Sequence, residues 1–225
     1  MKSTYAIIPV SRFSHAKTRL SPTLTPSERE GLLKAMLTDV TMALKGAVDE
    51  VVVISADEDV LEFAYELGVT IIQEKGQTDL NGALKQAIEW CSENCSKVII
   101  TPSDIPLLSI ANPKKFIEDS EKYDVVIAPA KGGGTNAIAF QPGAIELKFG
   151  DCSFFEHLQD AKNNELSFKI YDSFYLSLDV NTAEDLGEII LHGHDTHTQT
   201  YLKKLKLSAK PFHGSERLEI KRELI

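Results

Sequence analysis

Short apolar runs and amphipathic segments alternate along most of this chain of 225 residues. Runs of apolar and β-branched residues bounded by turn-forming residues are typical of buried strands. They predict strands at residues 5–10, 51–55, 69–72, 98–101, 124–128, 138–140, 168–170 and 174–178. Segments with an apolar residue at every third or fourth position predict amphipathic helices. These segments lie at residues 26–45, 57–67, 80–95, from 113 onward, 153–161 and 183–191.

Capping residues mark the starts of several predicted helices. Thr25 and Glu28 have the spacing of a capping box, and Pro26 occupies the first helical position between them. Side chains that can accept a hydrogen bond from a free helical N–H precede three further helices. These capping residues are Asp57, Asp79 and Asn112.

This alternation of strands and helices predicts the fold class. Strands that alternate with helices form a mostly parallel sheet covered by helices on both faces, which is the α/β class. Residues 1–191 therefore form one predicted domain. Residues 192–225 lack the alternation. We expect them to form a C-terminal extension, either an arm that packs on a partner subunit or a mobile end.

Composition narrows the class of function. The net charge is −9, and the extension carries seven Lys and Arg against four Asp and Glu, so residues 1–191 carry −12 by subtraction. This charge argues against general nucleic-acid binding. No apolar run approaches the roughly 20 residues of a membrane helix, and no signal peptide is evident. Three cysteines do not make a disulfide framework. We therefore expect a cytoplasmic protein that binds neither nucleic acid nor membrane.

Two carboxylates follow predicted strands. Asp104 lies just past the strand at 98–101, between Pro102 and Pro106, and Asp179 directly follows the segment 174–178. Ligands of open α/β sheets bind at the carboxyl ends of the strands. Two carboxylates at this edge predict a Mg²⁺ site, because Mg²⁺ prefers a few carboxylates together with substrate phosphates. The alternatives are a turn hydrogen bond for Asp104 and a helix cap for Asp179.

A cationic loop follows the first strand. Arg12, Lys17 and Arg19 lie within it, and this density of positive charge suits a polyphosphate. A solvated basic loop is the alternative. The sequence contains neither the P-loop motif nor a G-x-G-x-x-G motif after the first strand. A P-loop kinase and a dinucleotide-dependent dehydrogenase therefore both lose support.

Two glycine-containing segments are candidate anion sites. In residues 132–135, three glycines precede Thr135 and let backbone N–H groups approach an anion closely. Gly150 and Ser153 stand at the start of a predicted helix, whose amino end attracts phosphate or carboxylate. A plain hairpin turn and ordinary capping by Ser153 are the respective alternatives.

The ordered set of motifs resembles that of one known family. The motifs are Ile8-Pro-Val10, Ala16-Lys-Thr-Arg-Leu-Ser21, Leu80-Asn-Gly-Ala-Leu84, Pro102-Ser-Asp-Ile-Pro-Leu107, Gly133-Gly-Thr135, Phe149-Gly150 with Ser153, and Leu178-Asp-Val-Asn-Thr-Ala-Glu-Asp-Leu186. Over residues 5–190 they are similar to archaeal members of the 2-phospho-L-lactate guanylyltransferase family, the CofC family of coenzyme F-420 biosynthesis. The resemblance implies a single three-layer nucleotidyltransferase domain of the glycosyltransferase-A-like, Rossmann-like type.

The resemblance also implies a reaction and a set of site residues. GMP would pass from GTP to 2-phospho-L-lactate with release of pyrophosphate. The catalytic residues implied are Lys17, Arg19, Asp104 and Asp179, and Asp104 and Asp179 would hold Mg²⁺. The implied nucleotide-binding residues are Pro9, Arg12, Lys17, Arg19, Asn81 and Asp104. Those implied for the acceptor acid are Thr135, Gly150 and Ser153.

Two positions depart from the family pattern. Ser11 stands where many relatives have a lysine after the first strand, and we expect Arg12 to substitute for it. Asn181 stands where relatives in the broader superfamily often have a second acid. Other acceptors, phosphoenolpyruvate or 3-phospho-D-glycerate, and CTP in place of GTP remain alternatives, as does a non-catalytic nucleotide-binding regulatory subunit. The apolar residues of the extension lead us to expect a homodimer.

Overall fold

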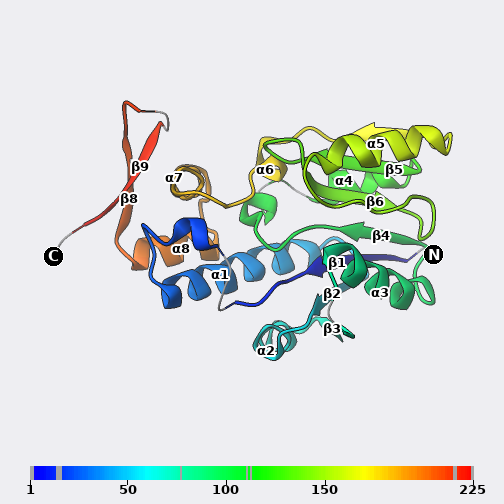
Figure 1. The fold of residues 1–225 in the computed structure, drawn as a ribbon, viewed down its shortest axis with the longest axis horizontal. Helices are drawn as coiled ribbons and strands as arrows, with labels where there is room; N and C mark the ends of the chain where they lie inside the picture. Colours follow the sequence, from blue (N-terminus) through cyan, green and yellow to red (C-terminus); the bar gives the residue numbers. More distant parts are fainter. Residues whose placement is uncertain are drawn as a thin grey trace.

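A seven-stranded sheet forms the centre of the computed structural model, which describes residues 3–13, 17–76, 78–109, 111, 113–214 and 217–223 (Figure 1). The strand order is β3-β2-β1-β4-β6-β5-β7, and only β6 runs antiparallel to its neighbours. The strands are β1 Thr4–Pro9, β2 Glu50–Ser55, β3 Thr70–Gln73, β4 Lys97–Ile100, β5 Val125–Pro129, β6 Thr135–Phe140 and β7 Phe168–Ile170. The predicted mostly parallel sheet is confirmed.

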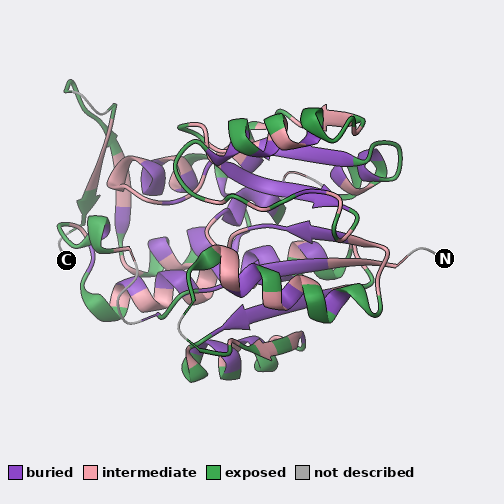
Figure 2. Ribbon diagram, turned by 45° about the vertical axis from the view of Figure 1, so that its right-hand side comes forward, coloured by how far each residue is buried: buried purple, intermediate pink, exposed green. Residues whose placement is uncertain are grey.

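Helices cover both faces of this sheet, as Figure 2 shows by the largely buried strands between more exposed helices. One apolar core joins Ile8 and Val53 to α1, α2, α7 and α8, and the other joins Ile7 and Val52 to α3 and α5. The helices are α1 Pro26–Lys45, α2 Glu58–Glu66, α3 Leu80–Ser92, α4 Pro113–Ser120, α5 Ser153–Asn163, α6 Phe174–Ser177, α7 Ala183–His192 and α8 His197–Lys204. Two 3₁₀ helices are η1 Thr18–Leu20 and η2 Pro106–Ser109. The three-layer α/β prediction is confirmed.

The predicted capping signals fix helix starts in the structure. Thr25 and Glu28 form a complete capping box at the start of α1. Asp57 accepts a hydrogen bond from the N–H of Val60, and Asp79 caps α3 in the same way. The predicted cap at Asn112 lies outside the described residues.

The prediction of a strand at 174–178 is wrong. Residues Phe174–Ser177 form the short helix α6. The backbone carbonyls of this segment bond to groups outside any strand ladder: the Leu176 carbonyl accepts from the side chain of Asn136, and the Ser177 carbonyl accepts from the Lys131 N–H. Leu176 is buried in the core. These tertiary contacts override the strand propensity of an aromatic-rich segment.

The segment after α7 contains ordered structure that the apolar pattern did not predict. It comprises α8 and a hairpin of β8 Leu207–Pro211 and β9 Leu218–Arg222, which projects beside α7 and α8 (Figure 1). The buried carboxylate of Asp39 on α1 accepts hydrogen bonds from the His197 and Thr198 N–H groups and from the Thr198 hydroxyl. This carboxylate therefore ties the start of α8 to α1. That the C-terminal extension packs on a partner subunit stays a prediction.

The hairpin also reaches the loop that follows η1. Arg222 on β9 donates to both carboxylate oxygens of Glu28, at 2.8 and 3.0 Å, and to the carbonyl of Thr23 at 3.3 Å. The hydrogen bond from Arg222 lowers the pKa of Glu28. Residues nearly two hundred positions apart in the sequence therefore meet at the start of α1. Within the described residues, we find no helix with the length and apolar character that a membrane span needs.

Candidate active site

Two loops meet at the carboxyl edge of the sheet and bring the predicted aspartates together. Asp104 lies in the loop after β4, and Asp179 lies in the loop between α6 and α7. The N–H of Val180 donates to the backbone carbonyl of Asp104 at 2.9 Å, which joins the two loops directly. The prediction that these two strand-end segments share one edge therefore holds for the backbone, although the segment before Asp179 is a helix.

Lys17 connects the two aspartates through a third side chain. Its Nζ lies 2.5 Å from Asp104 Oδ2 and 2.9 Å from Asn181 Oδ1. The Asn181 amide in turn donates to the Asp179 carboxylate. A cavity of about 270 Å³ opens beside this group. Its lining residues are Ser11, Lys17, Thr18, Arg19, Leu33, Ser103, Asp104 and Asn181.

The electrostatics of this group suit a cation. Burial and the neighbouring Asp104 raise the pKa of Asp179, which means that added positive charge would stabilise the ionised form of Asp179. Asp104 Oδ1 is buried and has no hydrogen-bond partner. Among the described residues no three His, Cys, Asp or Glu side chains gather as a metal group. Two carboxylates nevertheless fit Mg²⁺, which takes its remaining ligands from phosphates and water.

The alternative in which Asp179 caps the following helix is wrong. Thr182 is the N-cap of α7, and it forms a capping box with Asp185. Because another residue supplies the cap, Asp179 is left for a different role. Thr182 and Asn181 compete with Asp179 for this cap in the sequence, and the structure assigns it to Thr182.

Asp185 is a residue of this site that the sequence reasoning missed. Its buried carboxylate accepts from the N–H groups of Asn181 and Thr182 and forms an ion pair of 2.6 Å with Lys131. Burial alone would raise the pKa of Asp185, but these hydrogen bonds together lower it. Lys131 belongs to the β5–β6 turn, so Asp185 holds the glycine-rich turn against the Asp179 loop.

The cationic loop contributes unequally to the site. Lys17 has left-handed backbone angles, with φ 56°, which are uncommon for a residue with a side chain and often accompany functional sites. Arg19 also lines the cavity, whereas Arg12 is exposed outside it. Pro9 is the last residue of β1. The residues between Phe13 and Lys17 lie outside the described residues, including Ala16 of the predicted motif.

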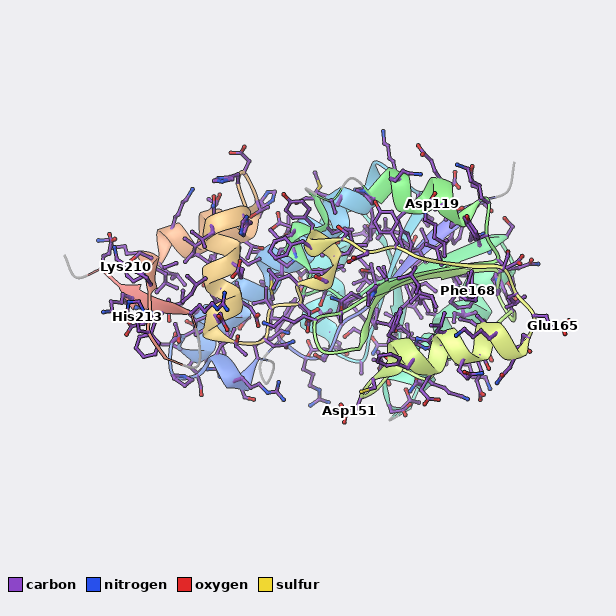
Figure 3. The ribbon with its side chains drawn as sticks, turned by 90° about the horizontal axis from the view of Figure 1, so that it is seen from above. Asp119, Asp151, Glu165, Phe168, Lys210 and His213 are labelled. Atoms are coloured by element: carbon purple, nitrogen blue, oxygen red, sulfur yellow. The ribbon has the colours of Figure 1, made fainter. Side chains whose placement is uncertain are left out.

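Thr135 and Ser153 meet in a second polar group. Thr135 is the first residue of β6, so the reversed direction of that strand places its start at the carboxyl edge of β4 and β5. Ser153 Oγ lies 3.3 Å from Thr135 Oγ1. Nδ1 of the buried His157 lies 3.0 Å from the same Thr135 oxygen. The capping alternative for Ser153 is wrong, because α5 has no side-chain cap. In Figure 3, Asp151 lies just before the amino end of α5 and Glu165 lies just after its carboxyl end.

The glycine-rich segment before Thr135 is a turn between antiparallel strands, as the hairpin alternative stated. The Ala130 N–H donates to the Gly134 carbonyl at 2.8 Å, and β5 pairs antiparallel with β6. Gly132 and Gly133 have φ of 97° and 88°, which only glycine adopts readily. The Gly133 carbonyl accepts from the Phe154 N–H at 3.2 Å, so the turn also anchors the start of α5.

Three side chains fix the irregular segment 146–149 beside this group. The Phe149 N–H donates to Asn81 Oδ1 at 2.8 Å, and Asn81 Nδ2 donates to the Phe149 carbonyl at 2.9 Å. The Lys148 N–H donates to His157 Nε2 at 3.0 Å, and the Glu146 N–H donates to Asp160 at 3.0 Å. The structure thus gives Asn81 the task of holding the segment before Gly150. Its contact with the nucleotide stays a prediction.

The buried His157 makes stability depend on pH. Burial lowers its pKa from 6.5 to about 4, with the Lys148 charge acting in the same direction. Between these values the unfolded chain binds a proton that the folded chain does not, so stability falls as the pH falls. We expect about 3 kcal/mol of unfolding free energy to be lost through this group from pH 7 to pH 4. Urea unfolding at several pH values measures this loss, with His157→Asn as the variant that lacks the histidine. If the unfolding free energies of the two proteins fell equally with pH, the prediction would be wrong.

A larger cavity of about 870 Å³ lies at the other edge of the sheet. Its lining includes Thr4 at the start of β1, Lys97 at the start of β4, and Asp124, which precedes β5. This edge carries the amino ends of the parallel strands, where open α/β sheets do not place their ligands. The smaller cavity beside Asp104 is therefore the candidate active site.

The sequence matches a family of known proteins along nearly its whole length. Residues 4–223 match the family described as guanylyl transferase CofC like. A curated 2-phospho-L-lactate guanylyltransferase from Methanothermobacter thermautotrophicus is 64% identical over 97% of this chain and 98% of its own. The match includes most of the extension that the motif resemblance did not reach.

Solved structures show the same fold at low sequence identity. A protein from Desulfovibrio desulfuricans G20 superposes with a TM-score of 0.73, at 19% identity over 91% of this chain and 95% of its own. A 4-diphosphocytidyl-2C-methyl-D-erythritol synthase from Anaerococcus prevotii superposes with a TM-score of 0.57, at 18% identity over 90% and 99% of the chains. The fold is thus the glycosyltransferase-A-like nucleotidyltransferase fold. With the family match along nearly its whole length, the chain belongs to the CofC family of guanylyl transferases.

Proposed function

We propose that this protein transfers GMP from GTP to 2-phospho-L-lactate and releases pyrophosphate. The observation that carries the proposal is the convergence of Lys17, Asp104 and Asp179 beside a cavity at the carboxyl edge of the sheet. The family membership and the name of the 64% identical relative support the choice of substrates.

The proposed reaction needs positive charge more than a protein nucleophile. A phosphate oxygen of the acceptor forms a bond to the α-phosphorus of GTP, while the bond from that phosphorus to the pyrophosphate oxygen breaks. Both reactants are anions, so the barrier comes largely from charge repulsion and positioning. Lys17 and Arg19 line the cavity and would hold the triphosphate and stabilise the leaving pyrophosphate.

Asp104 and Asp179 would hold Mg²⁺. When bound, Mg²⁺ neutralises developing charge on the phosphate oxygens. The unpartnered Oδ1 of Asp104 supports this assignment. In the structure Lys17 Nζ stands beside Asp104 and supplies positive charge to the acidic pair. We propose that Lys17 exchanges this contact for the nucleotide phosphates when GTP binds.

The second polar group suits the acceptor acid. Thr135 and Ser153 offer hydroxyl groups at the amino end of α5, where the helix dipole favours negative charge. Gly150 lies three residues before Ser153, and its carbonyl accepts the Ser153 N–H. We assign the phosphate or carboxylate oxygens of 2-phospho-L-lactate to these residues.

Pyrophosphate release tests the proposed function. The purified protein is mixed with Mg²⁺ and each combination of GTP, CTP, ATP or UTP with 2-phospho-L-lactate, phosphoenolpyruvate or 3-phospho-D-glycerate. We expect strong release only with GTP and 2-phospho-L-lactate, and none after chelation of Mg²⁺. Release with another pair would replace the substrates but keep the reaction, and GTP binding without any release would favour a regulatory nucleotide-binding role.

We also propose that the chain forms a homodimer. The support is the hairpin of β8 and β9, a two-stranded sheet whose outer edges are not paired in the described residues and which exposes Phe212. Light scattering is expected to give twice the chain mass of 24.9 kDa. A variant that lacks residues 206–225 serves as the comparison, and an unchanged mass for it would contradict the role of the hairpin.

A further inference from the structure

The polar group at the start of α5 contains a side chain to which the proposed function gives no task. His157 is fully buried, and its neighbours Ser153 and Thr135 are 2% and 7% exposed. A buried imidazole loses its hydration, so its two nitrogens need partners. His157 meets this need through one contact to a loop and one to Thr135.

The loop contact fixes which nitrogen carries the proton. The backbone N–H of Lys148 can only donate, and it points to His157 Nε2 at 3.0 Å. Nε2 therefore accepts and carries no proton, so the neutral ring carries its hydrogen on Nδ1. That hydrogen is donated to Thr135 Oγ1, 3.0 Å away.

This donation determines what the Thr135 hydroxyl offers to a ligand. A hydroxyl accepts up to two hydrogen bonds and donates one. Thr135 Oγ1 accepts from His157 and, at 3.3 Å, from the Ser153 hydroxyl. Its two accepting positions are then filled, and its own hydrogen must point away from both neighbours. The group left for a ligand is a donor, which suits an oxyanion.

We infer that His157 is a positioning residue that holds the Thr135 hydroxyl as a hydrogen-bond donor to an acceptor-acid oxygen. The inference rests on the proposed function, because that function places the acceptor at Thr135. His157 acts through Thr135 and does not itself touch the substrate. Its other contact, to Lys148, lies in a segment that Asn81 and Asp160 also hold, so the contact with Thr135 is the one on which the acceptor depends.

Two substitutions separate the two contacts of the ring. The amide of His157→Asn reaches the place of Nδ1 and can still donate to Thr135, but it loses the Lys148 contact. The longer side chain of His157→Gln reaches the place of Nε2 and can still accept from Lys148, but it loses the donation to Thr135. The pair therefore serves as a matched control for a purely structural role of the histidine.

The test is steady-state kinetics of pyrophosphate release. We expect His157→Gln to raise the KM for the acceptor by about 10-fold or more, with the KM for GTP unchanged. His157→Asn should keep the acceptor KM within about 3-fold of the natural protein. Thr135→Val should add less than about 2-fold in the His157→Gln background, since both changes remove the same donor.

Two results would count against the inference in distinguishable ways. A normal acceptor KM in His157→Gln, together with a raised acceptor KM in His157→Asn, would overturn the inference. It would show that the contact of His157 with Lys148 matters and that its donation to Thr135 does not. Nuclear magnetic resonance of the ring nitrogens gives a readout without turnover: we expect the proton on Nδ1, and a proton on Nε2 would also overturn it. An absence of turnover in the natural protein would instead overturn the proposed function.

Discussion

Asp104→Asn is expected to lower kcat/KM for nucleotidyl transfer by about 10³-fold or more, which corresponds to about 4 kcal/mol. The substitution removes the charge that pairs with Lys17 and one of the two carboxylates assigned to Mg²⁺. It keeps the shape of the side chain, so the fold should persist. Asp179→Asn should have a similar effect, because the amide cannot replace a metal-binding carboxylate. Pyrophosphate release at saturating Mg²⁺ measures both losses.

Asp57→Asn provides the matched control for these two variants. Asp57 also follows a strand of the sheet, β2, but it caps α2. Asparagine caps helices as well as aspartate does, so this variant should keep its activity. Near-normal turnover in both the Asp104 and Asp179 variants would exclude them from metal binding, and circular dichroism of each variant separates a lost site from a lost fold.

Asp39→Ala is expected to destabilise the protein by about 3 kcal/mol. The Asp39 carboxylate is 3% exposed and satisfies the N–H groups of His197 and Thr198 together with the Thr198 hydroxyl. Its removal leaves the N–H and the hydroxyl of the buried Thr198 without their partner. Urea unfolding monitored by fluorescence or circular dichroism measures the change as a shift of the midpoint at constant slope.

Asp39→Asn and Asp172→Ala are the controls for this stability change. Asparagine retains one accepting oxygen, so Asp39→Asn should lose less stability than the alanine variant. Asp172 is exposed, and its replacement should stay within about 0.5 kcal/mol. A change below this size in Asp39→Ala would show that α8 is not held by the carboxylate. A reduced unfolding slope would instead indicate that α8 and the strands β8 and β9 unfold separately from the sheet.

Much of the fold followed from local signals in the sequence. The capping box of Thr25 and Glu28 and the four-residue apolar spacing of α1 are both local, so they predicted the helix with its correct start and end. The segment 174–178 was mispredicted because its structure depends on distant partners. The Asn136 side chain that binds the Leu176 carbonyl lies 40 positions away. A pattern within one short window contains no information about such a contact.

The candidate site divides in the same way. Asp104 could be predicted because a lone carboxylate after a buried strand has a known place in an α/β sheet. His157 could not, because a histidine within an amphipathic helix is ordinarily a packing or surface residue. Only the approach of β6 and the segment 146–149 gives its two nitrogens their partners. The role of Lys131 could not be predicted either, because its partner Asp185 lies 54 positions later in the sequence.

The contact between Arg222 and Glu28 has a consequence for synthesis on the ribosome. At about 5–20 residues per second, the interval between these two residues lasts roughly 10–40 s. During that time Arg222 is absent, so the Thr23 carbonyl and the Glu28 carboxylate, which follow the cationic loop of Lys17 and Arg19, lack their partner. Contacts between residues so distant in sequence also form slowly during folding. We therefore expect nascent chains to complete the candidate active site beside Lys17 and Asp104 only after residue 222 has been added.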